Sequence, residues 1–94
     1  MTASFRIPKH ITWKNLKTGV VLLNLNSSDY FTLNEVASLI WRDLVEGAPR
    51  ERTVERILDE YDCDEEQVRA DLEVQLGFFL EEGLIESARP SREG

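Results

Sequence analysis

The first third of the chain has the hydrophobic pattern of short β-strands. Residues 11–13 alternate apolar and polar side chains, and residues 20–25 form a run rich in valine and leucine, so both segments are predicted as strands. Residues 30–33 are predicted as a shorter third strand. The segments 15–19 and 26–29 between them are rich in polar turn residues. Short turns that join three strands predict an antiparallel meander.

The rest of the chain has the periodicity of amphipathic helices. Asn34 is predicted to cap a helix over residues 35–46, and the Gly-Ala-Pro segment 47–49 is predicted to end it. A second, shorter helix is predicted over residues 53–61.

A third helix is predicted from Asp64 to about residue 82, where Gly83 ends it. Gln67 lies three residues after Asp64, which is the spacing of a capping box. Leu84 and Ile85 are expected to pack back onto the core as a final extended piece.

This order of elements predicts an α+β fold in which a three-stranded antiparallel sheet is followed by three helices, as in a winged helix-turn-helix. Three strands alone bury too little apolar surface, so the helices are expected to cover one face of the sheet. Residues 1–94 are predicted to form a single domain with its core at about 10–86 and a frayed tail at 87–94.

The third helix has apolar residues on two sides. At about 100° per residue, one stripe is expected to face the core, and Val74 and Phe78 fall about 180–240° from its centre. The stripe consists of Val68, Leu72, Leu76, Phe79 and Leu80. Val74 and Phe78 either form one wall of a groove for a partner or pack beneath the sheet or the chain termini.

The third strand is the candidate for the opposite wall. If it is also the spatial edge of the sheet, its backbone N–H and C=O groups are free to pair with an incoming chain. Tyr30 and Thr32 point to one face and Phe31 and Leu33 to the other. The sequence does not decide which pair faces the core.

Composition narrows the function classes. A net charge of −7 disfavours binding to nucleic acid phosphates, and the predicted third helix begins Asp64-Glu65-Glu66 with Arg69 as its only basic residue, which disfavours a DNA-reading winged helix. No apolar run is long enough for a signal peptide or a membrane span. The single cysteine excludes an internal disulfide and fits a cytoplasmic protein.

The chain lacks the residue patterns of a catalytic or metal site. His10 is the only histidine and has no predicted nucleophile or orienting acid near it. Cys63, between Asp62 and Asp64, is interpreted as a structural residue because one cysteine and a distant histidine make a poor ligand set. We expect no catalytic residue, no metal and no cofactor, and therefore a protein that is not an enzyme.

The order and spacing of several short motifs resemble the PqqD-like family. The resemblance covers about residues 10–86 and includes the hydrophobic second strand, a Tyr-x-x-Leu-Asn step and the Trp-containing first helix. The segments that carry it are 21–26, 30–36, 40–41, 52–54, 61–64 and 68–84. The turn 26–29 departs from the Pro-Glu-Gly-like step that is usual in the chaperone of pyrroloquinoline quinone synthesis.

The resemblance implies a recognition element for ribosomally made, post-translationally modified peptides. In that family the leader of a precursor peptide adds to the third strand and lies against the third helix. The residues implied at this site are Tyr30, Phe31, Thr32, Leu33, Gln67, Asp71, Val74, Gln75 and Phe78. A chain of this size is most similar to the stand-alone leader-binding subunit of lasso-peptide biosynthesis, which works with a separate leader peptidase and a cyclase.

Three alternatives stay open at this point. The first is a peptide chaperone for a radical SAM enzyme, and the second is a winged-helix transcriptional regulator. The third is a structural subunit that dimerises through the apolar strip of Val74 and Phe78. The leading expectation is a monomer or weak dimer that binds a precursor leader and neither nucleic acid nor a membrane.

Overall fold

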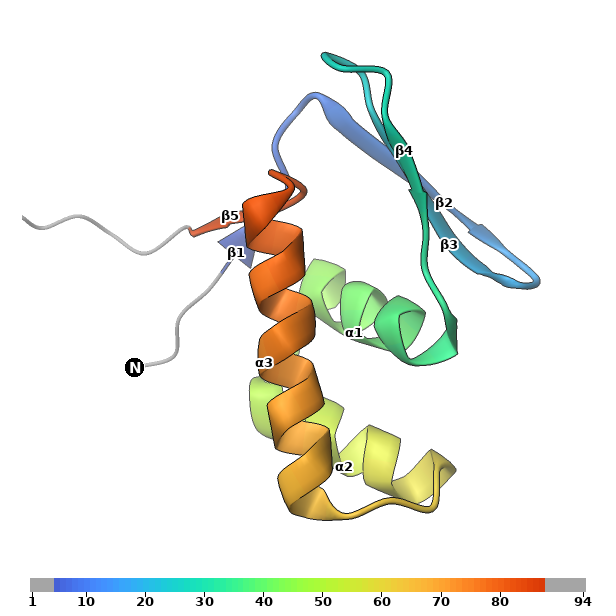
Figure 1. Cartoon of the computed structure of the whole chain (residues 1–94), viewed down its shortest axis with the longest axis vertical. Helices are drawn as coiled ribbons and strands as arrows, with labels where there is room; N and C mark the ends of the chain where they lie inside the picture. The colour runs from blue at the N-terminus through green and yellow to red at the C-terminus, as the bar shows by residue number, and fades with distance from the viewer. Residues whose placement is uncertain (1–4, 88–94) are drawn as a thin grey trace, which may run out of the picture.

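The computed structural model describes residues 5–87 and has the predicted sheet. Strands β2 (Ile11–Leu16), β3 (Gly19–Asn24) and β4 (Tyr30–Thr32) pair antiparallel in the order β2-β3-β4 (Figure 1). Because each strand is joined to the next by a short turn, the predicted meander is confirmed. β4 is an edge strand, and no strand within residues 5–87 pairs with its outer side.

Local signals in the sequence account for the ends of the first two helices. In α1 (Glu35–Glu46), the side chain of Asn34 accepts a hydrogen bond from Ala37 N–H at 2.8 Å, and Gly47 ends the helix with a φ of +76°. α2 (Arg50–Glu60) begins three residues earlier than predicted because Pro49 serves as its N-cap residue, with its carbonyl accepting from the first turn.

The predicted capping box of α3 (Glu65–Glu81) is wrong. The side chain of Asp64 makes no capping hydrogen bond. Gln67 instead donates its amide N–H to the carboxylate of Asp71 at 3.2 Å, one turn further along the helix. No helix within residues 5–87 is long and apolar enough to cross a membrane.

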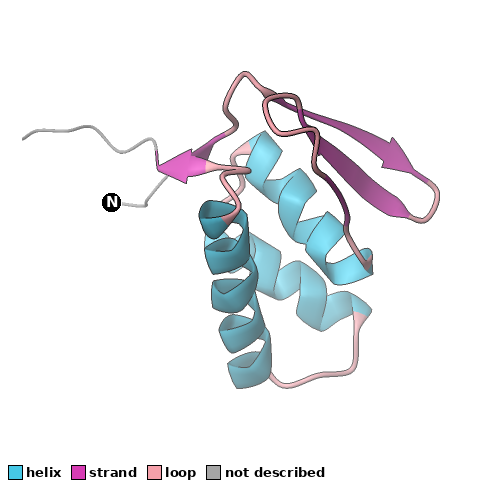
Figure 2. Ribbon diagram, turned by 45° about the horizontal axis from the view of Figure 1, so that its top comes forward, coloured by secondary structure: helices cyan, strands magenta, loops and turns pink. Residues whose placement is uncertain are grey.

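The helices lie on one side of the sheet, where α1 packs against it and α2 packs against α1 and α3 (Figure 2). Trp41 of α1 is fully buried and meets Trp13 of β2 edge-on at 6.2 Å and Phe79 of α3 at 5.3 Å, measured between ring centroids. One continuous core therefore joins the sheet to α3. Its buried apolar residues are Ile11, Val20, Leu22, Leu33, Ala37, Ile40, Trp41, Val54, Ile57, Val68, Leu72, Leu76, Phe79, Leu84 and Ile85.

A second, two-stranded sheet joins the ends of the described chain. β1 (Phe5–Arg6) pairs antiparallel with β5 (Glu86–Ser87), and Arg6 Nε lies 3.1 Å from a carboxylate oxygen of Glu86. Leu84 and Ile85 are buried, as predicted. The tail was expected to fray from Ser87, which here pairs with Phe5, and the rest of that segment lies outside the described residues.

Candidate functional site

The hydrogen-bond ladder leaves one side of β4 open. Leu33 N–H donates to the carbonyl of Val20, and Asn24 N–H donates to the carbonyl of Asp29, so the odd-numbered residues around β4 bond to β3. In an antiparallel pair, the residues between bonded pairs direct their N–H and C=O groups the other way. The backbone groups of Tyr30 and Thr32 therefore point away from β3, at the open edge of the sheet.

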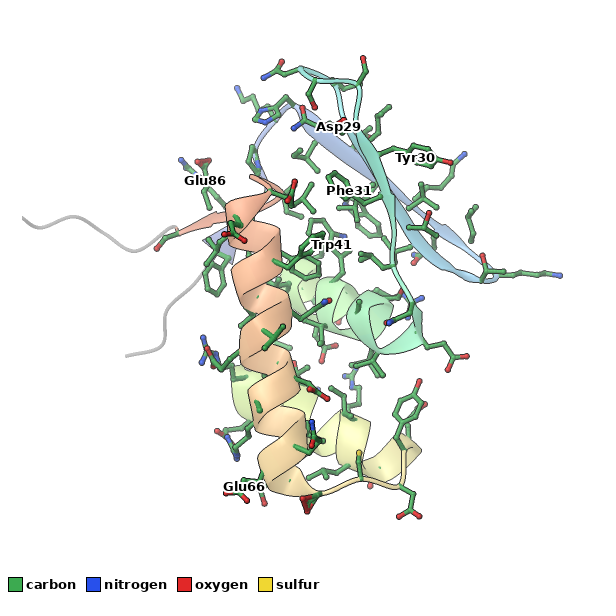
Figure 3. The ribbon with its side chains drawn as sticks, in the orientation of Figure 1. Asp29, Tyr30, Phe31, Trp41, Glu66 and Glu86 are labelled. Atoms are coloured by element: carbon green, nitrogen blue, oxygen red, sulfur yellow. The ribbon has the colours of Figure 1, made fainter. Side chains whose placement is uncertain are left out.

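The structure decides which face of β4 meets the core. Phe31 and Leu33 point inward, and Leu33 is only 5% exposed, so its side chain belongs to the core. Tyr30 and Thr32 point outward, and Tyr30 is 67% exposed. Figure 3 shows Tyr30 and Phe31 on opposite sides of the strand.

The five predicted site residues of α3 share one face of the helix, and one of them reaches β4. Gln67, Asp71, Val74, Gln75 and Phe78 follow one another along α3 at helical spacing. The ring of Phe78 meets the ring of Phe31 edge-on, with centroids 6.0 Å apart. This aromatic pair brings α3 and β4 together. Farther along the helix, Val74 is 71% exposed.

Of the two residues in the second apolar strip, one packs against the core and the other is exposed. Phe78 is partly buried and packs against the core through Phe31 and Phe79. Val74 has no such cover. Four residues of the predicted core stripe are buried, namely Val68, Leu72, Leu76 and Phe79, whereas the fifth, Leu80, is 43% exposed. Around the helix, Phe78 lies between the buried Phe79 and the exposed Val74, so its ring is shared between the core and the exposed face of α3.

The open face of α3 is polar and acidic around Val74. Asp71 lies one turn before Gln75, and Glu82 lies one turn after Phe78. Within residues 5–87, neither carboxylate makes an ion pair. Arg69, the only cation of the helix, points to a different side, where its ion pairs with Glu51 and Glu65 raise its pKa and lower the pKa of Glu51.

A buried hydrogen-bond network holds β4 in place. Ser38 Oγ accepts from Val20 N–H at 2.9 Å and donates to the carbonyl of Leu33 at 3.2 Å, which ties β3, the end of β4 and α1 together. Gly19 lies against the same carbonyl and has a φ of +141°, a conformation that side chains disfavour. The sequence interpretation missed both residues, although the glycine after a polar turn was a signal for one of them.

The residues considered for catalysis are placed elsewhere in the fold. His10 is partly buried, and its carbonyl accepts from Leu25 N–H at 2.8 Å. Cys63 is exposed, and its thiol donates to the carbonyl of Tyr61 at 3.6 Å. Within residues 5–87, no three His, Cys, Asp or Glu side chains form a group that could hold a metal ion.

Two surface cavities lie away from the β4–α3 site. One, of about 470 Å³, is lined by Phe5, the end of α1, the start of α2 and the middle of α3. The other, of about 360 Å³, lies between the β2–β3 turn and helices α1 and α2. The candidate site is therefore an open strand edge beside a helix face and has the shape expected for an extended chain rather than a small ligand.

Comparison with known proteins fits this geometry. The sequence matches the family described as coenzyme PQQ synthesis protein D (PqqD) over residues 19–85. The chain belongs to the PqqD family. The matched region of this PqqD-family protein runs from the start of β3 to Ile85, so it includes β4, α3 and the network that holds them. No curated protein matches the sequence.

Two solved structures are similar to the PqqD-family fold described here. One is a lasso peptide synthetase B1 complexed with the leader peptide, with a TM-score of 0.82 and 26% identity over 88% of this chain and 98% of that one. The other is TbiB1 in complex with the TbiA(beta) leader peptide, with a TM-score of 0.80 and 32% identity over 92% of this chain and 99% of that one.

Proposed function

We propose that this PqqD-family protein binds the leader segment of a ribosomally made precursor peptide. The leader pairs as an added strand with β4 and packs its inward side chains against the face of α3 that carries Val74 and Phe78. The site residues are the nine that the family resemblance implied, with one difference of role. Leu33 supports the strand from within the core, because its side chain is buried.

The observation that carries the proposal is the open edge of β4 beside α3. Tyr30 and Thr32 together offer two N–H donors and two C=O acceptors on a side that no strand within residues 5–87 covers. Main-chain bonds of this kind give affinity without requiring a particular sequence, and pockets for alternate side chains supply specificity. We expect Val74, which is exposed, and Phe78, which is partly buried beside Phe31, to contact such side chains.

The two similar structures support a leader peptide as the ligand. Both are complexes of a B1-type protein with a leader peptide, and both align with nearly all of this chain. On this basis we assign the protein to lasso-type biosynthesis, where it passes the precursor to a separate leader peptidase and a cyclase. It acts in the cytoplasm as a monomer or weak dimer, without catalysis or a cofactor of its own.

The family description points to PQQ synthesis as an alternative pathway from which the bound peptide comes. In that case the protein presents its peptide to a radical SAM enzyme of the PQQ type. Both proposed pathways use the same strand-addition site on β4. They are distinguished by which precursor's leader peptide the protein binds.

A single substitution at the open edge tests the proposal. Thr32→Pro removes an N–H that points away from β3, so the bonds between β4 and β3 remain and proline is tolerated at such an edge position. Thr32→Val is the matched control, because it changes the side chain and keeps the N–H. Calorimetric titration with a leader peptide measures the dissociation constant of each variant.

Thr32→Pro is expected to weaken leader binding by about 1–3 kcal/mol, or roughly five- to 150-fold, because it removes one bond and leaves a peptide carbonyl unpaired. Thr32→Val is expected to bind nearly as tightly as the parent protein. If the two variants bind the leader equally well, the leader does not pair with β4. If the parent protein binds no leader at micromolar concentration, the proposed function itself is wrong.

A further inference from the structure

The cavity of about 360 Å³ between the β2–β3 turn, the first half of α1 and the second half of α2 is called here the turn cavity. These three segments lie on the same side of the molecule (Figure 1). Positive side chains outnumber negative ones on the lining of the turn cavity, although the net charge of the chain is −7. The charged residues of the lining are Lys17, Arg42 and Arg56 against Glu35 and Glu60.

The three cations of the turn cavity keep N–H donors to spare. Arg42 donates from Nε to the neutral side-chain oxygen of Asn15 at 2.9 Å, and Arg56 donates from Nη1 to the carboxylate of Asp43 at 2.9 Å. Within residues 5–87, Lys17 makes no ion pair. Because a guanidinium or an ammonium has several N–H groups, donors remain on each of the three side chains.

The two carboxylates on the lining do not neutralise these cations. Glu35 instead accepts a hydrogen bond from the Tyr61 hydroxyl at 3.0 Å. Glu60 lies one turn after Arg56 on α2, yet neither Glu35 nor Glu60 makes an ion pair within residues 5–87. Arg56 has Asp43 as its anionic partner, whereas Lys17 and Arg42 have none in the part of the chain that the structure describes. Both are exposed, so a ligand can reach them.

The arrangement of these donors fits a carboxylate. Arg42 is positioned by Asn15 and Arg56 by the buried Asp43, so both guanidinium groups lose little conformational entropy when a ligand binds. The planar fork of a guanidinium matches the two oxygens of a carboxylate. Counted with Asp43, the cavity has as many negative as positive groups. A dianionic phosphate is therefore repelled more strongly than a carboxylate with its single charge.

The turn cavity lies at the end of β4, where the chain passes into α1. Ser38 lines the cavity, and its Oγ donates to the carbonyl of Leu33 at 3.2 Å. Glu35 of the lining follows Thr32 after only two intervening residues, which is a chain length of at most about 11 Å. A leader paired with β4 that continues past Thr32 in extended form advances about 3.3 Å per residue. A few further residues therefore span the distance to the cavity.

We propose that the turn cavity binds an Asp or Glu side chain of the same precursor peptide, about three to five residues beyond the segment that pairs with β4. The inference rests on the proposed function and adds a second contact to it. Lys17 and Arg42 donate to the carboxylate, and Thr18 lines the cavity beside them. Main-chain pairing alone allows a strand to slip along its partner, so a charged anchor at this position fixes the register of the leader on β4.

Two substitutions in the turn cavity and two matched controls test the proposal. Lys17→Gln and Arg42→Gln each remove one cation from the cavity, whereas Lys14→Gln on β2 and Arg52→Gln on α2 make the same changes at exposed positions outside it. The probes are the leader peptide that the protein binds and versions of it in which one Asp or Glu at a time becomes Asn or Gln. Calorimetric titration of full-length protein measures each dissociation constant. Urea denaturation checks that each variant is folded, and Lys17→Gln changes no ion pair within residues 5–87.

Lys17→Gln and Arg42→Gln are each expected to weaken binding of the unmodified leader by about three- to tenfold, and by less at high salt. One acid-to-amide leader peptide is expected to bind the parent protein equally weakly and to be insensitive to both substitutions, because the carboxylate that they contact is gone. The two control variants are expected to bind every leader peptide as the parent protein does.

Leader binding that is unchanged in both cavity variants would overturn the inference and leave the proposed function intact. So would losses that simply add to those of every acid-to-amide leader peptide, because no leader carboxylate then contacts Lys17 or Arg42. NMR shifts of the Thr18 and Gly19 amides with inorganic phosphate, but not with the leader, would overturn it as well by assigning the cavity to a free anion. A parent protein that binds no leader at all would instead refute the proposed function.

Discussion

Phe78 is the residue where the core and the proposed leader site meet, and Phe78→Ala separates its two roles. Its ring pairs with Phe31 at 6.0 Å and with Phe79 at 6.1 Å, and it is only partly buried. A fully buried phenylalanine costs about 3–5 kcal/mol when truncated to alanine, and aromatic pairs account for about 0.5–1.5 kcal/mol each. We therefore expect the free energy of unfolding to fall by about 2–3 kcal/mol.

Leader binding should fall as well, by about 1–3 kcal/mol, if the exposed part of the Phe78 ring receives a leader side chain. Urea denaturation measures the loss of stability, and titration of the folded variant measures the dissociation constant. Because both quantities come from one protein, a loss of binding can be corrected for any unfolded fraction.

Two neighbours on the same helix serve as controls. Val74 is 71% exposed, so Val74→Ala should change stability by less than about 0.5 kcal/mol and still weaken leader binding. Leu80, exposed on another side of α3, should affect leader binding little when truncated. The reasoning is refuted if Phe78→Ala lowers stability while the folded variant binds the leader as tightly as the parent, because Phe78 is then a core residue only.

Three further predictions concern the supports of the site. Gly19→Ala places a Cβ 2.5 Å from a backbone carbonyl oxygen at a φ of +141°. It should destabilise the protein by about 2–4 kcal/mol in urea denaturation. Gly77→Ala, in open space within α3, should instead stabilise the protein by about 0.5–1 kcal/mol. Asp43 is 1% exposed and accepts hydrogen bonds from Thr53 Oγ1 and Arg56 Nη1, both at 2.9 Å. Asp43→Ala should therefore lower the free energy of unfolding by about 2–4 kcal/mol, and a negligible loss would contradict that network. The hydrogen bond from Tyr61 to Glu35 raises the pKa of Tyr61 above 10.0, so its stabilising effect is present below that pH and lost as pH rises through the raised pKa. NMR titration should show a lower pKa for Tyr61 in Glu35→Gln, and an unchanged pKa would contradict this cause.

Local signals explain why the elements of this fold could be predicted. The strand and turn composition of the first third produced the observed meander, and Asn34 caps α1 through the hydrogen bond that its residue type favours. The pairing of β1 with β5 could not be predicted, because two-residue strands have no periodicity and their partners lie about eighty residues apart. α2 also began earlier than its apolar residues indicated, since its first turn is polar.

Only part of the candidate site could be predicted from the sequence. Helical rotation predicted four buried residues of α3 and the exposed Val74, but it assigned Leu80 to the core and left open whether Phe78 packs inward or faces a partner. Apolar residues lie on several sides of α3, so the position of the core stripe depends on what packs against it. Phe31 of the distant strand β4 decides that question by drawing Phe78 inward. The role of Ser38 is likewise a long-range contact that no local pattern contains.

Strand addition to β4 is tested most directly by amide hydrogen exchange, residue by residue, with and without a leader peptide. In the free protein, the amides of Phe31 and Leu33 are paired with β3, whereas those of Tyr30 and Thr32 point to the open edge. Our account predicts that the leader slows exchange at Tyr30 and Thr32 by about tenfold or more, with a much smaller effect at Phe31 and Leu33. Saturating leader that leaves the amides of Tyr30 and Thr32 exchanging as in the free protein would contradict it.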